Sequence, residues 1–281
     1  MKSNGEETHI RSGKELIKVG GLAVEHSIPQ AKKDSIPILF CHGLGGGSWI
    51  WSNFSEYFSS KGWDTYAMNY RGHYLSDPLE NLESCQFMDY VDDVEAVITH
   101  FGKDPYLFGH SLGGMVAQKY AERKNPAKLF LIDSGTCKAL TDRLDRDTIM
   151  KKMQEIGSYV EENSLIAIPW DPQKIKKFFF AEGMVEEEVV QEFVHKQGWE
   201  SKQAVMMSAI TPVDPEKIRC PVYVMGKEKG YSTGMPTNQW LADYYHARGV
   251  KTGEPMGHCF MKEKNWEVYA KIIESWLLGT P

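Results

Sequence analysis

The sequence has few of the features that mark secreted, metal-binding or nucleic-acid-binding proteins. Its cysteines are odd in number and scattered, at Cys41, Cys85, Cys137, Cys220 and Cys259. This spacing argues against a disulfide framework or a zinc site and favours a reducing compartment. Lysine and arginine (32 residues) are outnumbered by aspartate and glutamate (38), and no stretch gathers the basic residues. Nothing therefore indicates a nucleic-acid partner.

Long apolar runs are also missing. No segment approaches the ~20 consecutive apolar residues of a membrane span. The first residues are polar and acidic, without the apolar run of a signal peptide. These absences predict a cytoplasmic protein without a membrane span. The 281 residues are 42% hydrophobic, which is enough for one large α/β domain or one domain with an insertion.

The most informative stretch is a Gly-x-Ser-x-Gly pattern at residues 109–113. An apolar run precedes it and a helix-like segment from Met115 follows. This context is typical of a nucleophile elbow, in which the serine sits on a turn too tight for side chains beside it. The same pattern can arise by chance in a glycine-rich loop, but the flanking strand and helix favour the elbow. Ser111 is therefore the candidate nucleophile, and the amide of Leu112 is a candidate donor to developing negative charge.

A second glycine-rich loop, residues 42–49, follows the apolar run 36–41. It superficially resembles a dinucleotide-binding turn, but its third glycine is displaced, and no Gly-Lys-Ser/Thr follows as a P-loop requires. We therefore expect no cofactor and no metal. The interpretation we favour is that the amide of Leu44 turns toward Ser111 and completes an oxyanion hole with Leu112. His42, Gly43 and His110 are expected to contact substrate.

Short apolar runs alternate with helical segments, which predicts a mostly parallel, doubly wound sheet with helices on both faces. The expected strands are 15–19 and 22–26 (a hairpin), 36–41, 65–70, the run before Ser111, 129–132, 220–226 and 250–255. Expected helices cover 51–58, 87–101, 240–247 and 266–277. Between 136 and 212 the strand pattern stops, and four charged helical segments predict an inserted helical cap (lid). The core would then comprise 1–135 and 213–281.

One of the predicted cap helices groups Ile149, Met153, Ile156 and Val160 on one face. Another begins with Asp171 and Pro172, a favourable N-cap and first-turn pair. The cap also supplies aromatic residues and methionines, with Trp170 among the expected substrate contacts. Such side chains suit a small hydrophobic substrate, although they can equally pack the cap onto the core.

A serine nucleophile needs a base and a group that orients the base. Of nine histidines, His258 lies in a loop between the last predicted strand and the last helix. A lone loop histidine is usually a surface residue. However, loops at the carboxyl ends of parallel strands converge on one edge of the sheet, so His258 can reach Ser111. The other histidines have ordinary explanations in helices, near the N-terminus or beside the glycine-rich loops.

The chain resembles the α/β-hydrolase superfamily in residues 42–49, Arg71-Gly72-His73, residues 109–114 and Gly257-His258. In style these motifs look like its carboxylesterase, lipase-like and methylesterase branches. The resemblance implies the α/β-hydrolase fold and a serine–histidine–acid triad. Such enzymes usually carry the acid in the loop after the strand at 222–225, but residues 226–231 contain no aspartate.

Two carboxylates could replace the missing acid, namely Glu228 in that loop and Asp133 at the end of the preceding strand. We favour Asp133, because the sheet fixes a strand-end carboxylate, whereas Glu228 sits between two lysines. Asp133 could also simply brace its loop, and a third possibility is that no acid remains and catalysis is weak.

Serine rather than aspartate at the elbow argues against the dehalogenase and epoxide-hydrolase branches. The leading hypothesis is a serine hydrolase that cleaves an ester or thioester of a small hydrophobic molecule through an acyl-enzyme intermediate. Two alternatives stay open. One is a non-hydrolytic lyase or cyclase that uses His258 as a base, suggested by the altered acid loop. The other is a ligand-binding protein with weak turnover.

Overall fold

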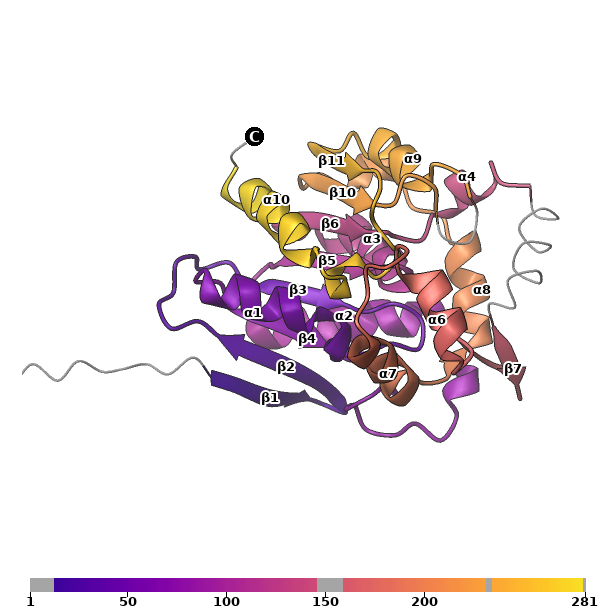
Figure 1. Cartoon of the computed structure of the whole chain (residues 1–281). Coiled ribbons are helices and arrows are strands. Elements are labelled where there is room, and N and C mark those ends of the chain that lie inside the picture. The colour runs from indigo at the N-terminus through magenta and orange to yellow at the C-terminus, as the bar shows by residue number, and fades with distance from the viewer. Residues whose placement is uncertain (1–12, 146–158, 231–233, 280–281) are drawn as a thin grey trace, which may run out of the picture.

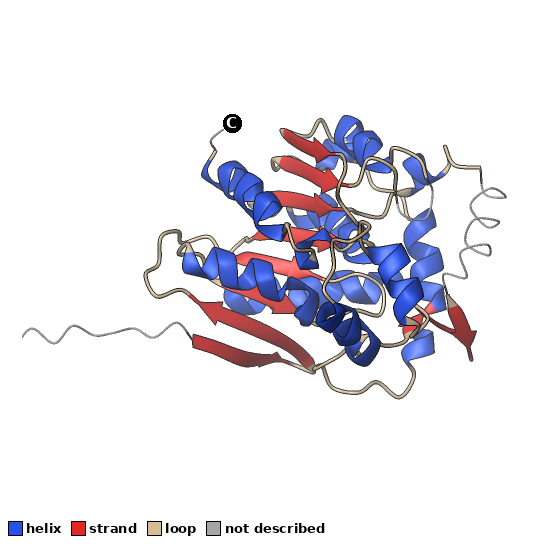
Figure 2. Ribbon diagram, in the orientation of Figure 1, coloured by secondary structure: helices blue, strands red, loops and turns tan. Residues whose placement is uncertain are grey.

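The computed structural model describes residues 13–145, 159–230 and 234–279 of the chain. An eight-stranded sheet runs through the centre of the molecule, with helices on both faces (Figures 1 and 2). Its strand order is β1-β2-β4-β3-β5-β6-β10-β11. Strands β1, β2 and β4 pair antiparallel, and the remaining neighbours pair parallel. The strands are β1 (Gly13–Val19), β2 (Leu22–Ile28), β3 (Ile38–Cys41), β4 (Thr65–Met68), β5 (Tyr106–His110), β6 (Lys128–Ile132), β10 (Val222–Gly226) and β11 (Gly249–Thr252).

The central strands are buried along their whole length, as expected where helices cover both faces of a parallel sheet. Their register places Phe40, Phe108, Phe130 and Tyr223 side by side on β3, β5, β6 and β10. The rings of Phe108 and Phe130 stack with centroids 4.2 Å apart, and those of Phe130 and Tyr223 lie 4.9 Å apart. This aromatic row packs one face of the sheet, because alternate residues of a strand share a face.

Helices α1 (Ser52–Ser60) and α10 (Trp266–Leu278) cover the face that carries the aromatic row. Helices α2 (Phe87–Phe101), α3 (Leu112–Lys124) and α9 (Thr237–Tyr244) cover the opposite face. Local signals set the ends of α2, which begins with a capping box at Gln86 and ends at Gly102 in the left-handed conformation. The short 3₁₀ helices are η1 (Ser48–Trp51), η2 (Leu82–Ser84), η3 (Pro215–Lys217) and η4 (Phe260–Lys262).

Residues 136–212 form the segment between β6 and the last two strands. It contains α4 (Lys138–Thr141), β7 (Val160–Glu162), β8 (Leu165–Ala167), α6 (Pro172–Phe179), α7 (Glu187–Lys196), β9 (Glu200–Ser201) and α8 (Lys202–Ile210). In Figure 1 this segment lies beside the carboxyl ends of the central strands. We propose that it acts as a cap over a core made of 1–135 and 213–281.

The predicted fold class is confirmed, as are the N-terminal hairpin and the helix that begins after Asp171. The Asp171 side chain accepts hydrogen bonds from the amides of Gln173 (2.8 Å) and Lys174 (3.2 Å). The prediction of a purely helical insertion is wrong, because β7, β8 and β9 form a small antiparallel sheet there. Of the helix expected around residues 149–160, positions 149–156 lie outside the described residues, and Val160 belongs to β7. Within the described residues, no helix combines the length and apolarity needed to cross a bilayer.

Candidate active site

The turn between β5 and α3 holds Ser111 in a strained conformation, with φ +54° and ψ −119°. A positive φ is unfavourable for a residue with a side chain. Hydrogen bonds fix the turn, because the Ser111 carbonyl accepts from the amides of Gly114 (3.0 Å) and Gly135 (2.9 Å). The Ser111 amide in turn donates to the Ile132 carbonyl of β6 at 3.3 Å. The backbone of two neighbouring strand ends therefore holds the elbow.

Close packing explains why glycines surround the serine. A Cβ at Gly113 would lie 2.3 Å from the His42 carbonyl oxygen, and one at Gly114 would lie 2.0 Å from Ser134 Oγ. A Cβ at Gly109 would lie 2.4 Å from the carbonyl oxygen of Gly113. All three distances are far below any normal contact, so the start of α3 can reach the ends of β3 and β6 only without side chains.

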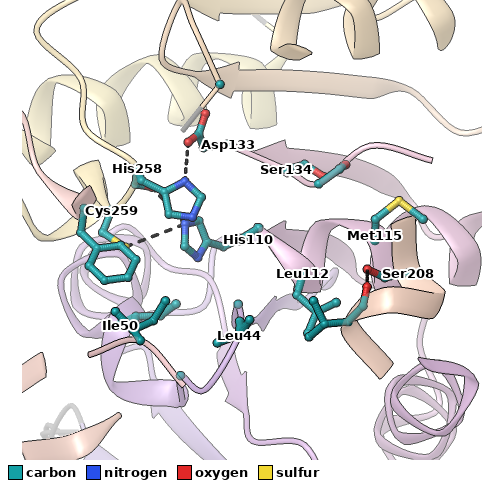
Figure 3. Close-up of a pocket in the computed structure, with 18 of the residues that line it drawn as sticks. Leu44, Ile50, His110, Leu112, Met115, Asp133, Ser134, Ser208, His258 and Cys259 are labelled. Atoms are coloured by element: carbon teal, nitrogen blue, oxygen red, sulfur yellow. Dashed lines mark hydrogen bonds and ion pairs between the residues drawn. The ribbon is translucent and has the colours of Figure 1, made fainter. Parts of the chain in front are cut away.

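His258 lies in the loop after β11, and its ring faces Asp133 (Figure 3). Its Nδ1 is 2.5 Å from Asp133 Oδ2. Since an ionised carboxylate only accepts hydrogen bonds, Nδ1 carries the hydrogen and Nε2 of the neutral ring is left as the acceptor. The loop is held on both sides of the histidine, because the Gly257 amide donates to Glu263 Oε1 (3.0 Å) and the Cys259 amide to the Phe179 carbonyl (2.8 Å).

Asp133 follows directly after β6 and has a positive φ of +39°. Its second oxygen, Oδ1, accepts from Asn238 Nδ2 at 2.6 Å and from the Lys227 amide at 3.2 Å. The loop that usually carries the acid therefore contributes a backbone donor to the aspartate of the neighbouring strand. Glu228, the other carboxylate considered from the sequence, is exposed.

A cavity of about 300 Å³ brings these residues together. Ser111, His258 and Asp133 line it, and so do Leu44 and Leu112, the two residues expected to form an oxyanion hole. The loop carrying Leu44 lies directly against the elbow, because a Cβ at Gly43 would be 2.9 Å from Ser111 Cβ. Most of the remaining wall is apolar and comes from both the core and the segment 136–212, including Trp49, Ile50, Met115, Leu144, Tyr159, Ile168, Phe179, Phe193 and Val205.

Comparisons with known proteins agree with this geometry. A family model described as alpha/beta hydrolase fold matches residues 36–162. The chain has the α/β-hydrolase fold. A solved structure of a thermophilic esterase from Thermogutta terrifontis superposes with a TM-score of 0.69 at 17% identity, covering 95% of this chain and 99% of that one. At this identity the likeness concerns the fold.

Two curated relatives align over a shorter part of the chain. Protein ABHD8 of Mus musculus is 27% identical over 114 residues, which cover 39% of this chain and 26% of that protein. A protein named probable proline iminopeptidase, from Leptolyngbya boryana, is 30% identical over 121 residues, covering 43% of this chain and 37% of the relative. The chain thus spans well under half the length of either relative.

Two of the expected substrate contacts do not line the cavity. Trp170 is 37% exposed and packs edge-on against Trp199, outside the cavity wall. His42 is fully buried behind the wall, with Nδ1 2.8 Å from the Gly43 carbonyl oxygen and Nε2 accepting from the Tyr70 amide. Burial lowers the pKa of His42 to about 3, so its ring is neutral at physiological pH. The expectation that these two residues touch substrate is therefore corrected, and His42 braces the loop instead.

Gly43 and His110 do line the cavity. His110 also stabilises the histidine loop, because its Nε2 donates to the His258 carbonyl at 3.0 Å and the two rings lie 4.6 Å apart. Burial lowers the pKa of His110 well below its ordinary value, so this ring is also neutral. Figure 3 shows both rings side by side. No group of His, Cys, Asp or Glu side chains suited to a metal ion occurs in the part of the chain that the structure describes.

The sequence reasoning missed Asn238 and several wall residues from the segment 136–212. Asn238 lies on α9, far from Asp133 in sequence, and no motif marks it. Other missed wall residues include Gln197, just after α7, and Ser208, on α8. A polar side chain at such a position is by default expected to face solvent.

Proposed function

We propose that this protein is a serine hydrolase that cleaves an ester or thioester of a small hydrophobic substrate through an acyl-enzyme intermediate. One observation carries the proposal. Asp133 binds Nδ1 of His258, which fixes the tautomer whose basic nitrogen is Nε2, and both residues line the cavity that also contains the strained Ser111. A nucleophile, a base and an orienting acid are the parts that such catalysis requires.

The proposed reaction begins when Ser111 Oγ attacks the substrate carbonyl carbon and His258 Nε2 takes the serine proton. The amides of Leu44 and Leu112 stabilise the oxyanion, and Asp133 stabilises the imidazolium. Collapse of the tetrahedral intermediate breaks the ester bond, and His258 returns the proton to the departing alcohol or thiol. Water then attacks the acyl-enzyme with His258 again as base, which releases the acid and regenerates the serine.

The cavity supports a small, uncharged substrate. Its volume of about 300 Å³ is at the lower end of the range for ligand pockets. Its described wall contains Asp133, which is already paired with His258, and neither a lysine nor an arginine. A carboxylate or phosphate on the acyl group would therefore lose its hydration without gaining a counter-ion.

The lyase or cyclase hypothesis rested on the altered acid loop, and the contact between Asp133 and His258 weakens that reason. The binding-protein hypothesis predicts thermal stabilisation by ligands without product. A peptidase-like activity is a second candidate, favoured by the similarity to the protein named probable proline iminopeptidase. Matched esters and amides of the same acyl groups would separate these classes.

The test is active-site labelling with a fluorophosphonate, followed by turnover of p-nitrophenyl esters of increasing acyl length. We expect labelling and turnover in the wild type and loss of both in Ser111→Ala. The control Ser84→Ala removes an exposed serine in η2, outside the cavity wall, and should change neither. Unaltered activity of Ser111→Ala would refute the proposal.

A further inference from the structure

Arg71-Gly72-His73 was one of the motifs that carried the family resemblance, yet the proposed reaction does not use it. His73 is 2% exposed, and its Nε2 lies 3.1 Å from Oε2 of Glu200, which has no exposed surface at all. His73 follows β4 in the core, whereas Glu200 opens β9 in the segment 136–212. A buried charged pair therefore joins the two parts of the protein.

The Glu200 carboxylate accepts hydrogen bonds from several donors besides His73. The Tyr90 hydroxyl and the Ser201 amide (2.9 Å) donate to Oε1, and the Gly45 amide donates to Oε2 at 3.4 Å. The other nitrogen of His73, Nδ1, lies 2.9 Å from the Arg71 carbonyl oxygen. Both ring nitrogens of His73 thus face oxygen atoms. When Glu200 is ionised, both nitrogens must carry a hydrogen, as in the doubly protonated imidazolium.

The balance of charge supports an ion pair at this site. Burial alone would lower the pKa of His73, but the charge and hydrogen bond of Glu200 raise it above its ordinary value. Burial alone would raise the pKa of Glu200, but the charge and hydrogen bond of His73, helped by Tyr90, lower it. Buried ion pairs add little net stability compared with apolar packing, and their best-attested use is to fix one arrangement of the chain.

The arrangement that this pair fixes is the loop beside the nucleophile. Gly45 has a left-handed φ of +59°, and a Cβ there would lie 2.4 Å from the Gly198 carbonyl oxygen. Its carbonyl accepts from the Gly198 amide at 2.7 Å, while its amide faces Glu200. Residues 198–200 therefore hold both polar groups of the Gly45 backbone. The Gly45 amide belongs to the peptide unit that follows Leu44, so these hydrogen bonds also limit rotation of the backbone at Leu44.

We propose that the Glu200–His73 ion pair is a positioning element that holds the Leu44 amide toward the oxyanion. The inference rests on the proposed function, because it assigns the pair a role in the same reaction. Neither side chain lines the cavity, so the pair acts through Gly45 and not on the substrate. In this arrangement the segment 136–212 contributes to the oxyanion hole as well as to the cavity wall.

The test is Glu200→Gln, which keeps the shape of the side chain. Tyr90 and Ser201 require an acceptor, so the amide oxygen should face them, and the amide NH₂ should face Gly45 and His73. The Gly45 amide would then face the NH₂ group, another donor, and the loop that carries Gly45 should shift. We expect kcat to fall about 10- to 100-fold with KM changed by less than about twofold, since loss of one oxyanion donor reduces kcat by roughly 10²–10³. The affinity of a trifluoromethyl ketone, which forms a tetrahedral adduct, should fall in parallel.

A matched control is Glu192→Gln. Glu192 on α7 pairs with Lys262 of η4 at 2.6 Å, so it also joins the segment 136–212 to the core, but it does not contact the loop at Gly45. We expect this variant to keep its kcat and its affinity for the ketone. A loss equal to that of Glu200→Gln would mean that weaker docking of the segment explains both, and would overturn the proposal.

Two further measurements keep the inference testable. If Glu200→Gln does not fold, His73→Gln should show the same loss in kcat without a matching rise in KM, and an unchanged kcat there would overturn the proposal. Hydrogen exchange of the Gly45 amide should accelerate in either variant, and unchanged exchange would also overturn it. A wild type that neither turns over substrate nor reacts with a fluorophosphonate would instead refute the proposed function, because the exchange measurement does not depend on catalysis.

Discussion

Replacing Asp133 with asparagine should nearly abolish turnover while leaving the fold intact. The reason lies in the surroundings of the two carboxylate oxygens. Oδ1 accepts from Asn238 Nδ2 and the Lys227 amide, and Oδ2 accepts from His258 Nδ1. The amide of Asp133→Asn has one oxygen and one NH₂ group, so only one orientation satisfies the two donors at Oδ1.

In that orientation the new NH₂ group faces His258. The reverse would place NH₂ against two N–H donors, at about 1–3 kcal/mol for each unpaired group. His258 Nδ1 must then accept a hydrogen bond, so the ring proton moves to Nε2, the atom that has to take the proton of Ser111. The wrong tautomer of the base reduces kcat by roughly 10³- to 10⁴-fold in related arrangements, or about 4 to 5.5 kcal/mol of transition-state stabilisation.

The assay is kcat/KM on a short p-nitrophenyl ester, with thermal unfolding to show that the variant is folded. Glu228→Gln is the matched control, because it changes the other candidate carboxylate, which is exposed, and we expect its rate within about twofold of the wild type. If Asp133→Asn kept more than about a tenth of the wild-type rate, Asp133 would not orient the base. A large loss in Glu228→Gln alone would transfer the role to Glu228.

Three further predictions concern the elbow, the buried histidine and the aspartate's support. Gly113→Ala should lower the free energy of unfolding by about 3 kcal/mol, because its Cβ would overlap the His42 carbonyl. The control Gly198→Ala, whose Cβ would meet nothing within 4 Å, should change the free energy of unfolding by less than about 0.5 kcal/mol. Equal urea midpoints for the two variants would contradict this prediction. The pKa of His42 is lowered from 6.5 to about 3, so the unfolded chain binds the extra proton first as the pH falls. The contribution of His42 to the free energy of unfolding is therefore complete above pH 6.5 and should fall by about 1.4 kcal/mol per pH unit below it. A free energy of unfolding, measured with urea, that does not change between pH 6.5 and 5 would refute the buried neutral ring. Asn238→Ala removes the 2.6 Å hydrogen bond to Asp133 and should lower kcat about tenfold at unchanged KM; steady-state kinetics with unchanged kcat would show that the Lys227 amide suffices.

The sequence alone predicted the succession of strands along the chain and the nucleophile elbow. It also predicted Ser111 and His258 as site residues, and both line one cavity with Asp133. These features depend on signals within a few residues. Alternating apolar runs mark buried strands, and glycines at 109, 113 and 114 mark places where no side chain fits. The position of His258 followed from one general property, that loops after parallel strands meet at one edge of a sheet.

The tertiary structure alone decided which groups meet across long separations in the chain. It placed Asp133 against His258 and left Glu228 exposed, because Asn238 and the Lys227 amide are brought to the end of β6 only when α9 packs on the sheet. Strands as short as β7, β8 and β9 carry too few residues for a period of two to be visible.

Long-range packing also explains why Trp170 was expected to line the cavity and does not, and why the sequence did not point to Glu200. Both belong to the segment 136–212, where composition indicates aromatic and acidic residues but not where each side chain points. Trp170 turned to the surface, whereas Glu200 entered the core and paired with His73. Local periodicity determines which elements form, and the packing of one element on another determines which side chains share a site.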